Sequence, residues 1–338
     1  MVVLNFYGKI EPICISKKLG LYLSNLPNGE HNNWRDGLVA EIQMSIKADN
    51  IYQEMLGSNY EPAFFQLFRN LYPKEEPPTV IDKPLIEKIV DQMICIYNEY
   101  SYDDMPMGGW DTNPFDGRLC EEDYSEKIID FINFLSYSIC EDYPLPTPIP
   151  QWVYSSNYHT IDHYRIFWGG EPADSYIHAL EKWGMILDNF LVDRNDYLLF
   201  DYLANSIHKD NEYNENHLMK DYSLCQLFLE KNRESELDSK LLQFFDPDDS
   251  EKERFRQGEL FRQMRNKIAH GDFIAFETKV DEYAVEFMDG RFDFDYSEYS
   301  RKNWVIQHVC CILDDVIRQL ICMLLFNRKD LEKLKNSV

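Results

Sequence analysis

The second half of the chain carries hydrophobic residues at the spacing of amphipathic α-helices, with polar residues between them. In the segment 172–192, Leu180, Trp183 and Phe190 fall on one face, and Pro172 is suited to the first turn. Further helices are expected at residues 196–208, 216–231, 251–270 and 302–326. The last of these is apolar over most of its surface, so we expect it to be buried in a bundle or in a dimer interface.

The first half mixes patterns typical of strands with patterns typical of helices. Residues 2–8 and 38–46 have the alternation or the β-rich content of strands, and a loop bearing Asn and Gly separates them. Residues 84–100 and 121–139 instead place apolar side chains at helical spacing. We therefore expect an N-terminal domain that is α+β or mostly helical.

A proline-rich stretch marks the clearest boundary in the chain. Four prolines occur among the seven residues Pro144–Pro150, which excludes both a helix and a central strand there. We predict a stiff connector over residues 144–150. It joins an N-terminal accessory or sensor domain, residues 1–143, to a helical domain, residues 151–338. The predicted fold class is mainly α.

A two-residue turn signal interrupts the helical pattern of the second half. Asp289–Gly290 favours a type I′ turn, and the residues on both sides alternate between apolar and polar. Closing the turn places Phe287 opposite Phe292, with Val285 and Tyr283 continuing the same face. This predicts a β-hairpin inserted into the helical domain, either as a lid or partner surface or merely packed on the bundle.

The composition indicates a folded protein without a secretory or membrane segment. The 338 residues are 44% hydrophobic and 14% aromatic, which argues against disorder and suffices for two cores. The N-terminus has no basic region followed by an apolar core, and no apolar run reaches the ~18 residues of a membrane span. We expect a cytoplasmic protein that does not associate with membranes.

Eight cysteines are scattered in mostly apolar patterns, without a Cys-x-x-Cys pair or a Cys/His cluster of zinc spacing. We expect free thiols in the core, no disulfide and no structural zinc. His159 and His163 are four residues apart, but no glutamate follows in the metalloprotease pattern. A phosphate-binding glycine loop is also missing from the sequence. The sequence therefore predicts neither a metal site nor a cofactor.

The cluster with the most useful chemistry lies near the end of the penultimate predicted helix. Arg265, Asn266 and His270 fall within one and a half turns. Arginine can hold a phosphate through two hydrogen bonds, and histidine is suited to proton transfer near neutral pH. Ser250 is a plausible N-cap of this helix, and Gly271 stands where a left-handed C-cap would end it. Residues five apart lie roughly 140° apart around an ideal helix. For the side chains of Arg265 and His270 to act on one substrate, either the helix end must be distorted or the site must be shared by two subunits.

Charge gives two opposite indications about nucleic acid. The net charge of −25 repels phosphate over most of the surface. Between Lys252 and His270, however, six basic residues stand against two acidic ones, a local excess of +4. The candidate RNA contacts in this basic strip are Arg254, Arg256, Arg262 and Lys267. The alternative is a solvated helix face whose charges pair with acidic neighbours.

The chain resembles the HEPN family in one motif on a long helix of a helical bundle. This motif is an arginine followed directly by Asn, with a histidine five residues after the arginine. The resemblance covers about the last half of the chain, residues 165–330, and Ala269-His270-Gly271 agrees with many bacterial members. Catalytic members of that family are metal-independent ribonucleases that act as dimers, with two motifs facing one another in a cleft. Many serve as toxins or as antiphage effectors of abortive infection.

The resemblance implies an endoribonuclease without a cofactor, in which the ribose 2′-OH attacks the adjacent phosphorus. It also implies a homodimer with a composite active site, and it assigns the catalytic positions to Arg265, Asn266 and His270. Since function does not follow from fold, the alternative is a HEPN bundle without catalysis that acts as a protein-binding or regulatory module. A third interpretation makes the N-terminal half a sensor that controls the nuclease. An antitoxin or a phage-derived activator would be the regulating partner.

Overall fold

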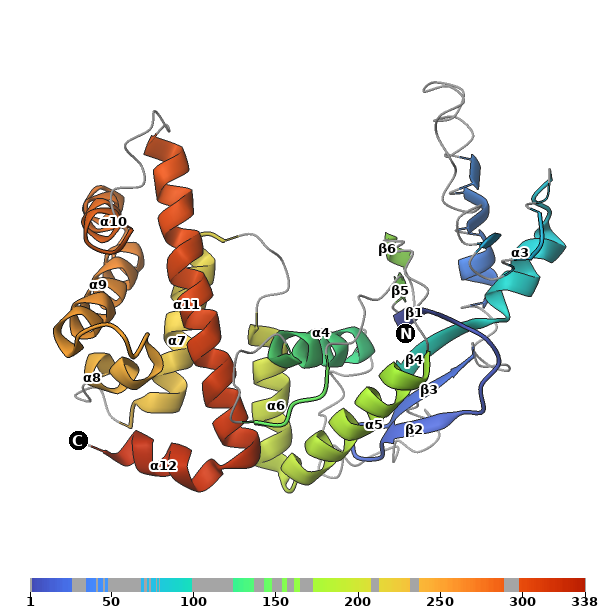
Figure 1. Ribbon diagram of the computed structural model, residues 1–338, viewed down its shortest axis with the longest axis horizontal. Helices are drawn as coiled ribbons and strands as arrows, with labels where there is room; N and C mark the ends of the chain where they lie inside the picture. Colours follow the sequence, from blue (N-terminus) through green and yellow to red (C-terminus); the bar gives the residue numbers. More distant parts are fainter. Residues whose placement is uncertain are drawn as a thin grey trace, which may run out of the picture. The chain divides into compact units, whose positions relative to one another are not determined.

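The computed structural model is mainly helical, as the sequence predicts, with one antiparallel sheet (Figure 1). The chain forms two compact units. Unit 1 comprises Met1–Asn133 and Pro146–Ala204, and unit 2 comprises Phe134–Leu145 and Asn205–Val338. The structure describes residues 2–25, 35–40, 42–44, 46–47, 68–69, 72, 74–76, 78, 80–98, 124–136, 143–147, 154–156, 161–164, 173–207, 213–231, 237–288 and 298–337.

This division differs from the predicted split at residues 144–150. The chain enters unit 2 at Phe134 and returns to unit 1 at Pro146, so most of the segment up to Ala204 belongs with the N-terminal sheet. Residues 143–147 have neither helix nor strand, as their proline content predicts, and 148–150 lie outside the described residues. The described part of the proline segment is thus neither helix nor strand, and the chain passes from unit 2 to unit 1 between Leu145 and Pro146.

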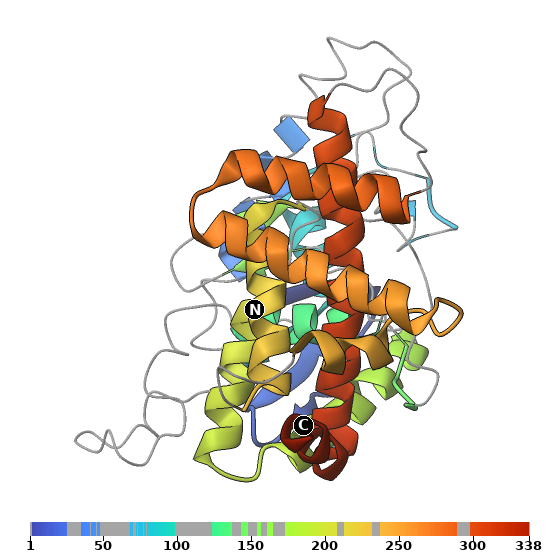
Figure 2. The same cartoon turned by 90° about the vertical axis from the view of Figure 1, so that its left-hand side faces the viewer.

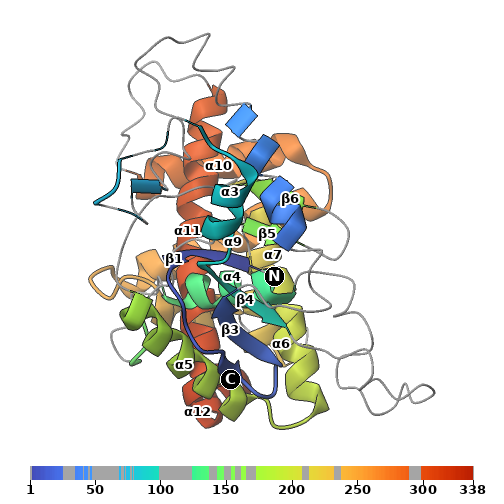
Figure 3. The ribbon, with the colours of Figure 1, turned by 90° about the vertical axis from the view of Figure 1, so that its right-hand side faces the viewer.

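Unit 1 is built on a six-stranded antiparallel sheet with the order β2-β3-β4-β1-β5-β6. Figure 3 shows β1, β3 and β4 side by side. The strands are β1 Val2–Tyr7, β2 Ile13–Ser16, β3 Leu21–Asn25, β4 Met93–Asn98, β5 Tyr154–Ser156 and β6 Ile161–Tyr164. The helices of this unit are α3 Lys83–Val90, α4 Tyr124–Ser136, α5 Ala173–Phe190 and α6 Arg194–Ser206; α4 and α6 end just beyond its boundaries.

The predicted helix over residues 84–100 is wrong in its second half. The helix α3 ends at Val90, and the chain turns at Asp91 and continues as the central strand β4. Consecutive residues of β4, among them Ile94, Cys95 and Ile96, are all buried, so the strand is covered on both faces. A strand buried on both faces reads as a continuous apolar run, which periodicity alone does not distinguish from a buried helix.

The strand-like pattern predicted at residues 38–46 is also wrong. The structure describes helix at residues 35–40, 42–44 and 46–47. Leu38 and Ile42 are buried in one apolar cluster with residues of α3 and β4, and Ile46 packs against it. Their spacing of four residues is helical, and burial of that face outweighs the local strand propensity.

Helix α5 lies against β2, and α4 and α5 confirm two of the predicted helices. Asp188 of α5 holds the turn that follows β2, because its carboxylate accepts hydrogen bonds from the Ser16 hydroxyl and from the backbone N–H groups of Lys17 (3.2 Å) and Lys18 (3.3 Å). The Lys18 ammonium in turn donates to the Leu191 carbonyl (2.7 Å), just beyond the end of α5. The end of α5 is thus tied to the sheet by directed polar contacts.

Unit 2 is a helical bundle built along its longest helix, α11. Its helices are α7 Glu215–Leu229, α8 Leu237–Leu241, the 3₁₀ turn η3 Leu242–Phe244, α9 Glu251–Ala269, α10 Phe273–Phe287, α11 Glu298–Phe326 and α12 Arg328–Asn336. In Figure 2 the orange helices α9 and α10 lie side by side and cross the red helix α11. The predicted burial of the last apolar segment is confirmed, because α11 packs against α7, α10 and α12.

The predicted β-hairpin is wrong in its first strand. Tyr283, Val285 and Phe287 belong to helix α10, in which Tyr283 is buried and Val285 is 76% exposed. Phe276, Val280 and Tyr283 form a buried face at helical spacing, and this face packs against α9 and α11. The predicted turn Asp289–Gly290 and the second strand lie outside the described residues.

Candidate functional site

The helix that carries the motif begins and ends where the sequence predicts. Ser250 caps α9 through a capping box, in which its hydroxyl accepts from the Glu253 N–H and the Glu253 carboxylate accepts from the Ser250 N–H. Along the helix, Leu260 and Met264 are fully buried, whereas Ile268 near the end of the predicted stripe is only partly buried. The apolar stripe therefore anchors the middle of α9 and leaves its last turn nearer the surface.

The end of α9 forms a Schellman motif around Gly271. This residue has φ +69°, its N–H donates to the Ile268 carbonyl (2.9 Å), and the N–H of Asp272 donates to the Lys267 carbonyl (2.9 Å). His270 is the C-cap residue, with φ −94° and ψ 0°. The predicted left-handed C-cap at Gly271 is thus confirmed, and the side chain of His270 is exposed at the end of α9.

Arg265 is half-buried between α9 and α7 and is held by neutral groups. Its Nη1 donates to Asn266 Oδ1 (3.1 Å), its Nη2 donates to Gln226 Oε1 (3.2 Å), and its guanidinium carbon lies 5.9 Å from the ring centroid of Tyr222. Within the described part of unit 2, Arg265 has no carboxylate within ion-pair distance, and its Nε is buried without a hydrogen-bond acceptor. Its charge is therefore positioned but not neutralised by a direct partner.

Asn266 contacts the arginine of the motif directly. Its amide oxygen accepts from Arg265, so it orients the guanidinium. Over the residues that the structure describes, no hydrogen bond joins the side chains of Arg265 and His270. One chain therefore brings Arg265 and Asn266 together and leaves His270 separate from them.

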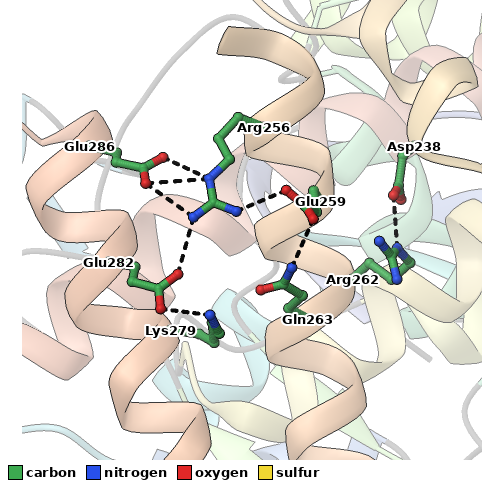
Figure 4. A network of polar contacts seen from close by, with 8 residues as sticks. All are labelled: Asp238, Arg256, Glu259, Arg262, Gln263, Lys279, Glu282 and Glu286. Atoms are coloured by element: carbon green, nitrogen blue, oxygen red, sulfur yellow. Dashed lines mark hydrogen bonds and ion pairs between the residues drawn. The ribbon is translucent and has the colours of Figure 1, made fainter. Parts of the chain in front are cut away.

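Three of the four candidate RNA contacts in the basic strip are paired with acidic groups. Arg256 donates to Glu259 (2.8 Å), Glu282 (3.1 Å) and Glu286 (2.9 Å), the last two on α10. Hydrogen bonding from Lys279, and then from Arg256, lowers the pKa of Glu282, which keeps this carboxylate ionised. The network in Figure 4 holds three cations and four carboxylates, namely Arg256, Arg262 and Lys279 beside Asp238, Glu259, Glu282 and Glu286.

The other three candidate RNA contacts also bind neighbouring groups. Arg262 pairs with Asp238 (2.8 Å), and Lys267 pairs with Asp272 (3.2 Å). Arg254 donates to a backbone carbonyl of η3 at 3.1 Å. The local excess of positive charge in the sequence is thus largely offset in space. The sequence left two alternatives for Arg256, Arg262 and Lys267, namely contacts to RNA or pairing with acidic neighbours. Their contacts in this chain are of the second kind.

A second polar cluster, which the sequence analysis does not identify, lies inside the bundle. His217 and Asp221 on α7 face Asp314 on α11, and His217 Nε2 lies 2.9 Å from Asp221 Oδ2 and 3.4 Å from Asp314 Oδ1. Burial lowers the pKa of His217, but Asp221 and Asp314 outweigh this effect and raise it to about 9. Burial raises the pKa of Asp221 to about 7. The sequence signal is a polar pair at i and i+4 on a buried helix face.

The described cysteines agree with the predicted core role in most cases. Cys95, Cys225, Cys310 and Cys322 are buried, Cys14 is exposed, and none of the six described cysteines forms a disulfide. Of the two histidines four residues apart, His163 lies in strand β6, and His159 is outside the described residues. None of the described helices is long and apolar enough to cross a membrane.

No protein-family model, curated protein or solved structure matches this chain. Its function is therefore inferred from its own residues.

Proposed function

We propose that unit 2 is a metal-independent endoribonuclease of HEPN type, with its site at the C-terminal end of α9. The observation that carries this proposal is the state of Arg265, a half-buried guanidinium held by Asn266, Gln226 and Tyr222 without a carboxylate partner. An arginine in this state can offer its charge to a phosphate, whereas Arg256 already faces three carboxylates. The exposed His270 near it supplies a group for proton transfer.

The proposed reaction is attack of a ribose 2′-OH on the adjacent phosphorus. His270 removes the proton of the 2′-OH or protonates the 5′-oxygen that leaves, and Arg265 stabilises the charge on the non-bridging oxygens. Asn266 keeps the guanidinium in place through its amide oxygen. Because one copy does not join Arg265 to His270, two copies facing each other complete the set, and their two His270 residues divide the acid and base roles.

The phosphate contacts of the site are proposed to centre on Arg265. Lys267 can exchange its exposed contact with Asp272 for phosphate at little cost, because surface ion pairs are weak. Arg262 is less free to do so, because its partner Asp238 has a side chain only 12% exposed and would be left as a buried carboxylate without a cation. Arg256 is the least suited of the strip, since three carboxylates surround it. The acidic exterior restricts binding of other RNA. This fits an effector that an antitoxin keeps inactive, or one that stays inactive until a phage-derived molecule activates it.

The test is cleavage of a labelled structured RNA by the purified full chain, with and without EDTA. We expect cleavage in both conditions, with a cyclic phosphate or 3′-phosphate at the new end. The same RNA with a 2′-deoxy residue at the cut position should resist cleavage there, because the attacking hydroxyl is missing. Absence of cleavage in every condition, including activation by a cognate phage lysate, would favour the non-catalytic binding module.

Replacing Arg265 by alanine is expected to lower the cleavage rate by about 10²–10³-fold, the usual loss when one donor to the developing charge is removed. The matched control is Arg301→Ala on α11, an exposed arginine of the same unit paired with Asp281 at 3.1 Å. Initial rates of both variants are compared after their thermal unfolding curves are shown to match the wild type. Equal rates for the two variants would remove Arg265 from the site.

A further inference from the structure

Two helices of unit 2 present metal-ligand side chains to each other inside the core. Helix α7 carries His217 and Asp221, and α11 carries Cys310 and Asp314. Each pair is spaced i, i+4, so both members lie on the same face of their helix. Because α7 and α11 pack along each other, the two faces meet. The sequence separates these pairs by about ninety residues, which is why neither forms a recognisable zinc spacing.

The distances allow the four side chains to share one ion. One ligand atom each from His217, Asp221 and Cys310 lies within 4.8 Å of the others, and Asp314 Oδ1 is 3.4 Å from His217 Nε2. A tetrahedral zinc ion with bonds of about 2.0–2.3 Å holds its ligand atoms roughly 3.3–3.8 Å apart. Side-chain rotations that move their ligand atoms by about 1 Å would therefore bring His217, Asp221 and Cys310 to one zinc ion, and Asp314 stands beside His217 as the fourth ligand.

The arrangement of Asp221 points to a shared cation. Asp221 is 1% exposed. Its Oδ2 lies 2.9 Å from His217 Nε2 but accepts no hydrogen bond of normal geometry. His217 Nε2 also faces Asp314 Oδ1, so two carboxylates converge on one imidazole nitrogen. Polar side chains buried in a protein core are paired or coordinate metals, and an imidazole nitrogen faced by two carboxylates and a thiol is a set of groups that zinc accepts.

The surroundings hold the imidazole in one orientation. The ring of Tyr213 stacks on that of His217, with centroids 5.3 Å apart and an interplanar angle of 14°. Tyr213 is in turn hydrogen-bonded to Cys311, which follows Cys310 on α11. Contacts outside the ligand set commonly fix the direction of a metal-binding histidine in this way.

We propose that α7 and α11 bind one zinc ion through four side chains, those of His217, Asp221, Cys310 and Asp314. On binding, the Cys310 thiol loses its proton to solvent and forms a Zn–S bond, and His217 binds as the neutral imidazole. All four protein ligands are buried, so no position is left for substrate and the ion is structural. It links α7 to α11 and thereby fixes the helix that supplies Tyr222 and Gln226 to Arg265.

The test measures metal in the full chain, purified without a metal-binding tag. We expect about one zinc per chain in the wild type, a loss of at least ten-fold in the variants C310S and D314N, and no loss in C322S. Cys322 is a buried cysteine of α11, three turns beyond Cys310, and is the matched control. Failure of the wild type to retain zinc, or equal zinc in C310S and C322S, would overturn the site.

Cobalt identifies the ligands even if a variant folds poorly. After zinc is removed, Co²⁺ added to the wild type should give the visible bands of a tetrahedral site and a thiolate-to-cobalt band in the near ultraviolet. That second band should disappear in C310S and remain in C322S. A cobalt spectrum without a thiolate band in the wild type would exclude Cys310. None of these readouts requires RNA cleavage, so the zinc site and the nuclease can each fail without the other.

Discussion

His270→Ala is expected to lower the rate of RNA cleavage by about 10²–10⁴-fold while leaving the fold intact, because it removes a proton-transfer group. The side chain is exposed at the C-cap of α9, and the capping hydrogen bonds there are made by backbone groups. Alanine preserves those bonds, so the free energy of unfolding should change by no more than ~0.5 kcal/mol. Single-turnover cleavage of a labelled RNA and thermal unfolding of the same preparation measure the two quantities.

The control for this variant is His178→Ala, another exposed histidine, which lies on α5 in unit 1 and pairs with Glu181. It should cleave RNA at the wild-type rate. Cleavage by the His270 variant at the wild-type rate would show that another residue transfers the proton, even if the protein is a ribonuclease. A loss that instead followed the melting temperature would indicate a structural role for His270.

The motif helix was the element most completely predicted from sequence, because its signals are local. Ser250 and Gly271 act within one turn of themselves, and both occupy the predicted cap positions. The contact between Arg265 and Asn266 is also local. The ion pairs of Arg256 with Glu282 and Glu286 and of Arg262 with Asp238 were not predictable, because these carboxylates come from α10 and α8.

The wrong predictions have one physical cause, namely that burial of a face decides between helix and strand where the local pattern permits both. Tyr283 and Phe287 fit the alternation of a strand, but Phe276 and Val280 extend a helical face that packs against two helices. In β4 the reverse holds, because burial on both faces removes the alternation that would have marked a strand. Whether such a segment becomes helix or strand depends on which elements pack against its two faces, and a single sequence does not contain this information.

The buried cluster of α7 and α11 shows the same limit for sites. His217 and Asp314 are 97 residues apart and meet only because two helices pack in register. Each helix places its pair on a buried face that is otherwise mostly apolar, and pairs at this spacing are common on helix surfaces. Pairs at i and i+4 on helices that are otherwise apolar are therefore the sequence feature most useful for finding this kind of site.

Gly184→Ala is expected to destabilise unit 1 by about 3 kcal/mol, which for a domain of this size lowers its melting temperature by about 10 °C. A Cβ on Gly184 would lie 1.9 Å from the carbonyl oxygen of Ile15 in β2, a distance that requires backbone movement. Separation of α5 from β2 would also weaken the contacts of Asp188 with the turn after β2. The added methyl therefore acts on the junction between helix and sheet.

The matched substitution is Gly258→Ala in α9, where an added Cβ would have its nearest neighbours at 3.6 Å, an ordinary contact. Since alanine favours a helix interior over glycine by about 1 kcal/mol, this variant should be as stable as the wild type or more so. Hydrogen exchange read by mass spectrometry separates peptides of α5 from those of α9 and so assigns each change to its unit. Equal stability of the two variants would mean that α5 does not approach β2 as closely as the distance of 1.9 Å implies. Opposite changes in melting temperature would show that the effect of the added methyl depends on the space behind each glycine.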